Sequence, residues 1–230
     1  MQQRAHPSGA PVRMPATPSE VCDPERLALI VYDMQNGVVR QLPDGKAITD
    51  RVRSIVDAAR EAGLPIVFTR HMSLPVRLMG ASQLRTAMAW QRVDDPGLVV
   101  SPFLPGSEPF ELVPELAPRA DEAVLDKITM SAFEGTPLDL VLRDLGITSF
   151  AIVGIATEIG IEPTVRQGLD LGYLPVLVSD ACGHGDAEAA RRSLDQLDFF
   201  GGTLRTDTEA FLGALVDCRR GLTPPSAPPA

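Results

Sequence analysis

The chain has 230 residues, of which 44% are hydrophobic and 22% charged, a balance typical of a globular protein long enough to bury the core of one α/β domain. Its net charge of −9 argues against nucleic acids and anionic membrane surfaces as partners, because both require a basic patch. The three cysteines, Cys22, Cys182 and Cys218, show no Cys-x-x-Cys spacing, so we expect neither a disulfide framework nor a zinc site, and no cofactor.

Both ends of the chain are predicted to be flexible tails. Residues 1–24 and 218–230 are rich in small residues and proline, and such segments bury too little apolar surface to offset the entropy lost on ordering. The N-terminus has no signal-peptide core, and no apolar run approaches the roughly 20 residues of a membrane span. We therefore expect one domain over residues 25–217, in a protein of the cytoplasm.

Between the tails, apolar runs alternate with amphipathic stretches. The runs that predict strands are Leu27–Tyr32, Pro65–Thr69, Ala123–Leu125, Phe150–Ile155 and Pro175–Val178. The stretches that predict helices are Ile48–Ala62, Pro137–Leu145, Ile159–Leu171 and Ala187–Phe200. This alternation predicts βαβ units, and hence an α/β three-layer sandwich whose mainly parallel sheet is covered by helices on both faces.

The segment from Met72 to Arg119 is less regular, with one short helix predicted at Leu84–Trp90. A loop-rich insertion on an α/β scaffold usually covers the site or contacts another subunit. Its tryptophan, Trp90, is equally well explained as filling a core gap or as lining a pocket or interface. The segment also holds apolar residues that a small domain need not bury internally: Leu78, Met79, Leu84, Met88 and Val93.

Three further residues lie where predicted strands end. Asp33 directly follows Leu27–Tyr32, Lys127 follows Ala123–Leu125, and Gly160 lies in the turn where an α/β enzyme presents its nucleophile. The carboxyl ends of parallel strands meet at one edge of a sheet, so these residues are expected to converge there. Taken singly, Asp33 is equally well a turn or N-cap aspartate, and an isolated lysine is usually a solvated surface charge.

The residues around these positions resemble the isochorismatase-like (cysteine hydrolase) superfamily. Val31–Asn36 is similar to its first motif, and Lys127–Leu138 to its second, a lysine followed by Ser-Ala-Phe and Gly-Thr-x-Leu. Gly154–Gly160 resembles the turn Gly-x-Ala-Thr-x-x-Cys. The resemblance implies that Asp33 is the catalytic acid/base and that Lys127 is its cationic partner. We recognise no nicotinamidase-type metal cluster of one aspartate and several histidines in the sequence, so we expect no metal.

The chain departs from this pattern at Gly160, where the family usually has its nucleophilic cysteine. Without a thiol there is no covalent intermediate. The resemblance implies that true isochorismatases also have glycine here and protonate an enol ether with the aspartate. We therefore expect a hydrolase that cleaves an enol-ether C–O bond or an activated C–N bond of a small metabolite by non-covalent acid/base chemistry. The alternatives are a catalytically inactive member that binds a small molecule or acts as a scaffold, and a carrier-associated tailoring subunit, although no carrier domain is recognised.

Four residues are candidates for contact with substrate or an oxyanion. The resemblance implies a cis peptide before Ala156, which would aim the N–H groups of Ala156 and Gly160 at an anion. His71, near the place where isochorismatases carry a glutamine, is either a substrate contact or a satisfied turn histidine. Glu158 either caps a helix N-terminus or activates water in the space left at Gly160. Members of the family generally associate, so we expect a homo-oligomer that acts on a small-molecule substrate.

Overall fold

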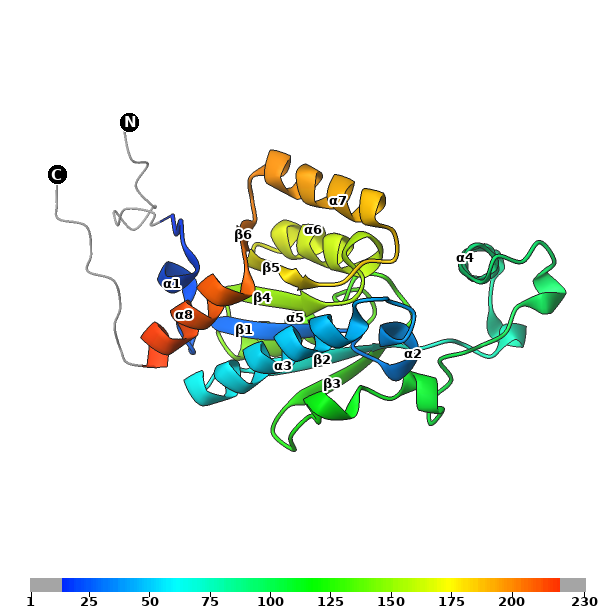
Figure 1. The fold of residues 1–230 in the computed structure, drawn as a ribbon, viewed down its shortest axis with the longest axis horizontal. Coiled ribbons are helices and arrows are strands. Elements are labelled where there is room, and N and C mark those ends of the chain that lie inside the picture. The colour runs from blue at the N-terminus through cyan, green and yellow to red at the C-terminus, as the bar shows by residue number, and fades with distance from the viewer. Residues whose placement is uncertain (1–13, 220–230) are drawn as a thin grey trace.

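The computed structural model describes residues 14–219, which form a six-stranded sheet between two layers of helices (Figure 1). The strands are β1 (Leu27–Tyr32), β2 (Ile66–His71), β3 (Ala123–Lys127), β4 (Ser149–Gly154), β5 (Leu174–Cys182) and β6 (Leu204–Thr206). They lie in the order β3-β2-β1-β4-β5-β6, and each neighbouring pair is parallel. The predicted α/β three-layer sandwich is therefore confirmed.

Helices cover both faces of the sheet, and every residue of the central strands β1 and β4 is therefore buried. The α-helices are α1 (Pro18–Val21), α2 (Asn36–Val39), α3 (Gly45–Ala62), α4 (Ala81–Gln91), α5 (Leu138–Asp144), α6 (Glu162–Asp170), α7 (Ala187–Phe200) and α8 (Thr208–Arg219). Alternate β1 residues face opposite layers: Leu29 belongs to the core cluster that includes residues of α3 and α8, and Ile30 to the cluster that includes residues of α5, α6 and α7. Among the described residues, none of these helices has the length and hydropathy to cross a membrane.

The outer strands are less protected than the centre. β3 lies at one edge of the sheet, and Val124 and Asp126 on it are exposed. Its last residue, Lys127, is buried. This strand is held to β2 along its length and by an ion pair from Arg70 to Asp126, with 2.7 Å between Nε and Oδ1.

Several boundaries differ from the sequence-based prediction. β2 and β3 run on to His71 and Lys127, so these polar residues end their strands instead of following them. The predicted helix Ile159–Leu171 is divided into a π-helical turn, η5 (Thr157–Ile161), and α6. β6 and α8 were not predicted, because three strand residues and a weakly amphipathic helix give little periodic signal.

The predicted N-terminal tail, residues 1–24, is wrong over its last part. Residues Pro18–Val21 form α1, and Val21 is buried in the core on the side that α8 covers. At the other end α8 continues to Arg219, two residues past the predicted domain end. The ordered domain therefore begins before residue 25, and residues 1–13 and 220–230 of the predicted tails lie outside the described residues.

The segment between β2 and β3 has a part, around α4, that projects away from the sheet at its carboxyl edge (Figure 1). It contains α4, which includes the predicted helix Leu84–Trp90 and has no buried residue. It also contains four single turns of 3-10 helix, η1 (Val76–Leu78), η2 (Pro96–Leu98), η3 (Glu108–Phe110) and η4 (Pro114–Leu116). Trp90 is 47% exposed, so it does not fill a gap in the core of this chain.

Candidate active site

Asp33 directly follows β1, and its carboxylate is buried at the carboxyl edge of the sheet. Its φ of +47° lies in the left-handed region, which residues with a side chain seldom adopt and which is enriched at functional sites. Thr69 on the neighbouring strand β2 holds this conformation. The Thr69 Oγ1 donates to Asp33 Oδ1 at 2.6 Å, and the Asp33 N–H donates to Thr69 Oγ1 at 3.2 Å.

Lys127 ends β3 and forms an ion pair with Asp33, with 2.7 Å between Nζ and Oδ2. The side chains are only 1% and 7% exposed, so each charge is compensated mainly by the other. The ammonium also donates to the Tyr32 hydroxyl at 2.7 Å and to the Thr129 carbonyl at 3.2 Å. These three acceptors use all three N–H groups of the lysine. The structure thus brings together the two residues proposed from the sequence as an acid/base pair.

Gly160 lies in the turn after β4, where the peptide between Ile155 and Ala156 is cis, as expected. The two amides proposed as oxyanion donors differ in their surroundings. The Gly160 N–H donates to the carbonyl of Ala156 at 3.0 Å, so the turn itself uses that group. Within residues 14–219, the Ala156 N–H has no acceptor. Of the two, only Ala156 has an amide available to a ligand.

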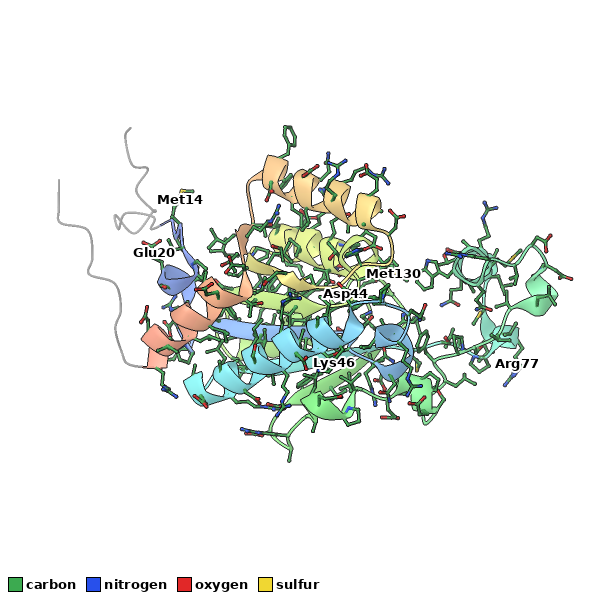
Figure 2. All side chains as sticks on the ribbon, viewed as in Figure 1. Met14, Glu20, Asp44, Lys46, Arg77 and Met130 are labelled. Carbon is green, nitrogen blue, oxygen red and sulfur yellow. The ribbon has the colours of Figure 1, made fainter. Side chains whose placement is uncertain are left out.

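The space beside Gly160 is occupied by Tyr32, the last residue of β1. A Cβ atom added to Gly160 would lie 1.8 Å from the Tyr32 hydroxyl oxygen and 2.3 Å from its Cζ. The hydroxyl accepts from Lys127 and donates to the carbonyl of Met130, which Figure 2 labels on the side of the sheet toward α4. The space left at Gly160 is therefore not open to a water molecule, which contradicts the alternative that Glu158 activates water there.

Burial raises the pKa of the Tyr32 hydroxyl well above its usual value of 10, and the negative charge of Asp33 adds to the effect. The phenol is therefore neutral throughout the physiological pH range. Neither Tyr32 nor Thr69 was predicted from the sequence to be a site residue. One signal was present for Tyr32: it is an aromatic residue with a polar group, directly beside the candidate acid.

His71 ends β2 and is paired in register with Lys127. Its backbone is fixed by the buried Gln35, whose side chain accepts from the His71 N–H at 2.7 Å and donates to its carbonyl at 3.0 Å. The imidazole makes edge-on contacts with the rings of Trp90 and Phe103, both at 5.9 Å between centroids. Burial lowers the pKa of His71 below its usual 6.5; the Asp33 charge opposes this shift and the Lys127 charge adds to it.

Glu158 is tied to the segment that leads into α7. Its Oε1 accepts from the backbone N–H groups of Gly185 at 2.7 Å and Asp186 at 2.9 Å. Its Oε2 is buried and has no hydrogen-bond partner in the part of the chain that the structure describes. These contacts favour a structural role for Glu158, but at a different helix from the one expected: the N–H groups that it satisfies lie just before α7, and not at the start of the helix that follows β4.

Cys182 does not resemble an activated nucleophile. Its thiol is buried and lies 3.2 Å from the carbonyl of Val178, and burial raises its pKa. Reactive cysteines have a lowered pKa and are partly exposed. Across residues 14–219, no group of three or more histidine, cysteine, aspartate or glutamate side chains is arranged to hold a metal ion.

The chain is similar to known proteins over most of its length. A sequence model of the isochorismatase domain matches residues 27–209. The ureidoacrylate amidohydrolase RutB of Acinetobacter baylyi is 30% identical over 205 residues, which cover 82% of this chain and 83% of that protein. The RutB of Klebsiella pneumoniae is 30% identical over 221 residues, 89% of this chain and 93% of that one.

Solved structures share the fold at lower identity. A cysteine hydrolase from Pseudomonas syringae superimposes with a TM-score of 0.71 at 24% identity, covering 86% of this chain and 96% of its own. The N-carbamoylsarcosine amidase from Thermoplasma acidophilum gives a TM-score of 0.67 at 24% identity, covering 80% and 97%.

Proposed function

Because this chain belongs to the isochorismatase family of hydrolases, we propose that it hydrolyses a small metabolite and that Asp33 is the residue that moves the proton. The observation that carries the proposal is the buried pair of Asp33 and Lys127, with 2.7 Å between Oδ2 and Nζ at the carboxyl edge of the sheet. Open α/β sheets bind ligands at this edge. A carboxylate held beside a buried cation there is suited to proton transfer.

The reaction is proposed to be non-covalent. Position 160, where the family resemblance expects a cysteine, is glycine, and the phenol of Tyr32 stands in the adjacent space. Cys182 is a poor substitute because its thiol is buried with a raised pKa. Water is therefore the attacking nucleophile.

In the proposed step, Asp33 removes a proton from a water molecule as its oxygen bonds to the electrophilic carbon. The bond from that carbon to the leaving nitrogen then breaks, and Asp33 returns the proton to the nitrogen. Lys127 compensates the charge of the carboxylate before and after the transfer. The Ala156 N–H is proposed to donate to the oxygen that becomes negative.

The substrate is proposed to contain an activated C–N bond beside a carbonyl. Two observations support this choice: the curated relatives are named ureidoacrylate amidohydrolases, and the ion pair with Lys127 suits a base in the resting state better than an acid. Enol-ether hydrolysis is the second candidate. Gly160 favours it, because the resemblance gives isochorismatases the same residue.

The test is turnover of small ureido compounds, amides and isochorismate by the purified protein and by Asp33→Asn. The variant is expected to lose at least about 100-fold in kcat, the usual contribution of a general acid or base. Asp50→Asn is the matched control, because Asp50 is exposed and pairs with Lys46 on α3. Blocking the thiols of the wild type is expected to leave turnover intact.

Full activity in Asp33→Asn would exclude Asp33 as the proton carrier. Loss of activity on labelling Cys182 alone would assign the reaction to a displaced cysteine. Binding of these compounds without turnover would establish the inactive binding protein instead.

A further inference from the structure

Tyr32 stands between the ion pair and the turn at Gly160, and we propose that it is a positioning residue that fixes Lys127 against Asp33 and closes position 160 to any side chain. Tyr32, Lys127 and Gly160 then form one interdependent unit. The inference rests on the proposed function only where activity is the readout.

The Tyr32 phenol makes hydrogen bonds on two sides. Its single proton is donated to the Met130 carbonyl, so the oxygen presents lone pairs to the Lys127 ammonium at 2.7 Å. The Nζ also lies 4.2 Å from the centroid of the Tyr32 ring, within cation–π range. Without the phenol oxygen, one N–H of a lysine side chain that is 1% exposed would lose its acceptor.

Lys127 has no N–H group free to bind a substrate. Its three N–H groups are directed to Asp33, Tyr32 and Thr129. None is left for a substrate, so Lys127 acts on the reaction through Asp33. A change at Tyr32 should therefore alter the rate of the chemical step more than the binding of substrate.

The Tyr32 phenol is packed tightly against position 160. The phenol cannot easily move away from residue 160, because it is 2% exposed and its hydroxyl is bonded on two sides. The opposite wall is also fixed: Thr164 Oγ1 donates to the Gly160 carbonyl at 2.6 Å and accepts from the Ala132 N–H at 3.0 Å. Any side chain at position 160 must displace the phenol from Lys127.

The packing is tested without a substrate by a double-mutant cycle of Tyr32→Val and Gly160→Cys. In the wild-type background, Gly160→Cys should lower Tm by roughly 2–12 °C, as expected for overpacking in a domain of this size. In the Tyr32→Val background the added loss should be small, because the smaller side chain leaves room for the thiol. Gly213→Cys is the matched control, because nothing lies within 4 Å of a Cβ at Gly213. Equal losses in both backgrounds, or no loss in the wild type, would overturn the inference.

Its hydrogen bonding is tested by titrating the phenol. The sequence has two tyrosines, so in Tyr173→Phe the phenolate absorbance reports Tyr32 alone. The titratable groups beside it are Lys127, which donates to the phenol oxygen, and Asp33, whose negative charge acts on the phenol. No phenolate should form while the protein is folded. Reversible titration of the folded protein near the ordinary value of about 10 would overturn the inference.

Its role in the reaction is tested with Tyr32→Phe, which keeps the ring and removes the oxygen. The expected result is a kcat about 10- to 100-fold lower with KM nearly unchanged, and an altered pH profile of kcat/KM. Tyr173→Phe is the control. If Asp33→Asn is inactive and Tyr32→Phe matches the wild type in kcat and pH profile, the inference fails and the proposed function stands. If the wild type turns over no substrate, the proposed function fails and the stability cycle decides the inference.

Discussion

The ion pair of Asp33 and Lys127 determines how the protein responds to substitution in its site. Two opposite charges in a poorly solvated place stabilise each other, and removal of one leaves the other without compensation. The free energy of unfolding lost on removing one partner usually exceeds the net contribution of the intact pair. The two residues are therefore expected to be energetically coupled.

Lys127→Met should lower the free energy of unfolding by about 3–5 kcal/mol, because it leaves the Asp33 carboxylate buried and unpaired. Adding Asp33→Asn should recover a substantial part of that loss, since a neutral amide is less costly to bury. Denaturant unfolding of the single and double variants measures both values. Lys46→Met, which breaks the exposed pair with Asp50, should cost less than about 1 kcal/mol. Strictly additive losses at Asp33 and Lys127 would contradict the coupling.

The sequence indicated Asp33, Lys127 and Gly160 as site residues because each follows or ends a strand-like run. It did not indicate Tyr32 and Thr69 as part of the site. Their contacts depend on the order of the strands in the sheet. Thr69 reaches Asp33 because β2 lies beside β1, and Tyr32 at the end of β1 reaches Lys127 because β3 lies on the other side of β2. Strand order is a property of the assembled sheet, and a single sequence gives it no local signal.

At the scale of elements, the end of β2 connects the site to the projecting segment. His71 lies beside Lys127 in the sheet and contacts Trp90 of α4. Its lowered pKa means that the folded protein binds this proton more weakly than the unfolded chain. The stability linked to His71 is thus present above about pH 6.5 and is lost as the pH falls toward the lowered pKa.

Trp90 offers a direct measurement of this titration, because it is the single tryptophan of the chain. Its fluorescence should fall when the neighbouring imidazole becomes protonated, since an imidazolium quenches indole. The midpoint is expected below pH 6.5, the ordinary value. His71→Gln should give emission that is flat over the same range. A midpoint at or above the ordinary value would contradict the burial-driven shift.

The elements around the site were predictable to different degrees. β1 and α7 occur with the residues that the hydrophobic pattern predicts, because long runs of one periodicity dominate them. The turn after β4 was not predicted. The sequence has a helical pattern from Ile159, but the structure has a π-helical turn there, and the spacing of apolar residues does not distinguish a π-helical turn from an α-helix.

In the part of the chain that the structure describes, the projecting segment leaves apolar side chains exposed. Leu98 and Val100 are each 60% exposed, and α4 contributes nothing to the core. Apolar side chains grouped on a projection are typical of a subunit interface. The expectation of a homo-oligomer therefore stays a prediction with a defined surface.

Light scattering should give a mass that is a multiple of the 24.6 kDa chain. Replacing Leu98 and Val100 together with serine should shift the protein toward the single chain. The matched control replaces Leu140, in the first turn of α5, and Leu145, directly after this helix. Both are similarly exposed and lie far from the projection in sequence. A wild type that scatters as 24.6 kDa at working concentrations would refute the prediction.

Because Lys127 lies on the edge strand β3, the site can open at a lower free energy than the domain needs to unfold. Edge strands open by local fluctuation at a fraction of the free energy that unfolds a whole domain. β3 is bonded on one side only, and its hold on β2 includes the exposed pair of Arg70 and Asp126. When β3 frays, Lys127 leaves Asp33 although β1, β4 and β5 remain paired. On warming, Lys127 should therefore separate from Asp33 at a lower temperature than the one at which β1, β4 and β5 unfold.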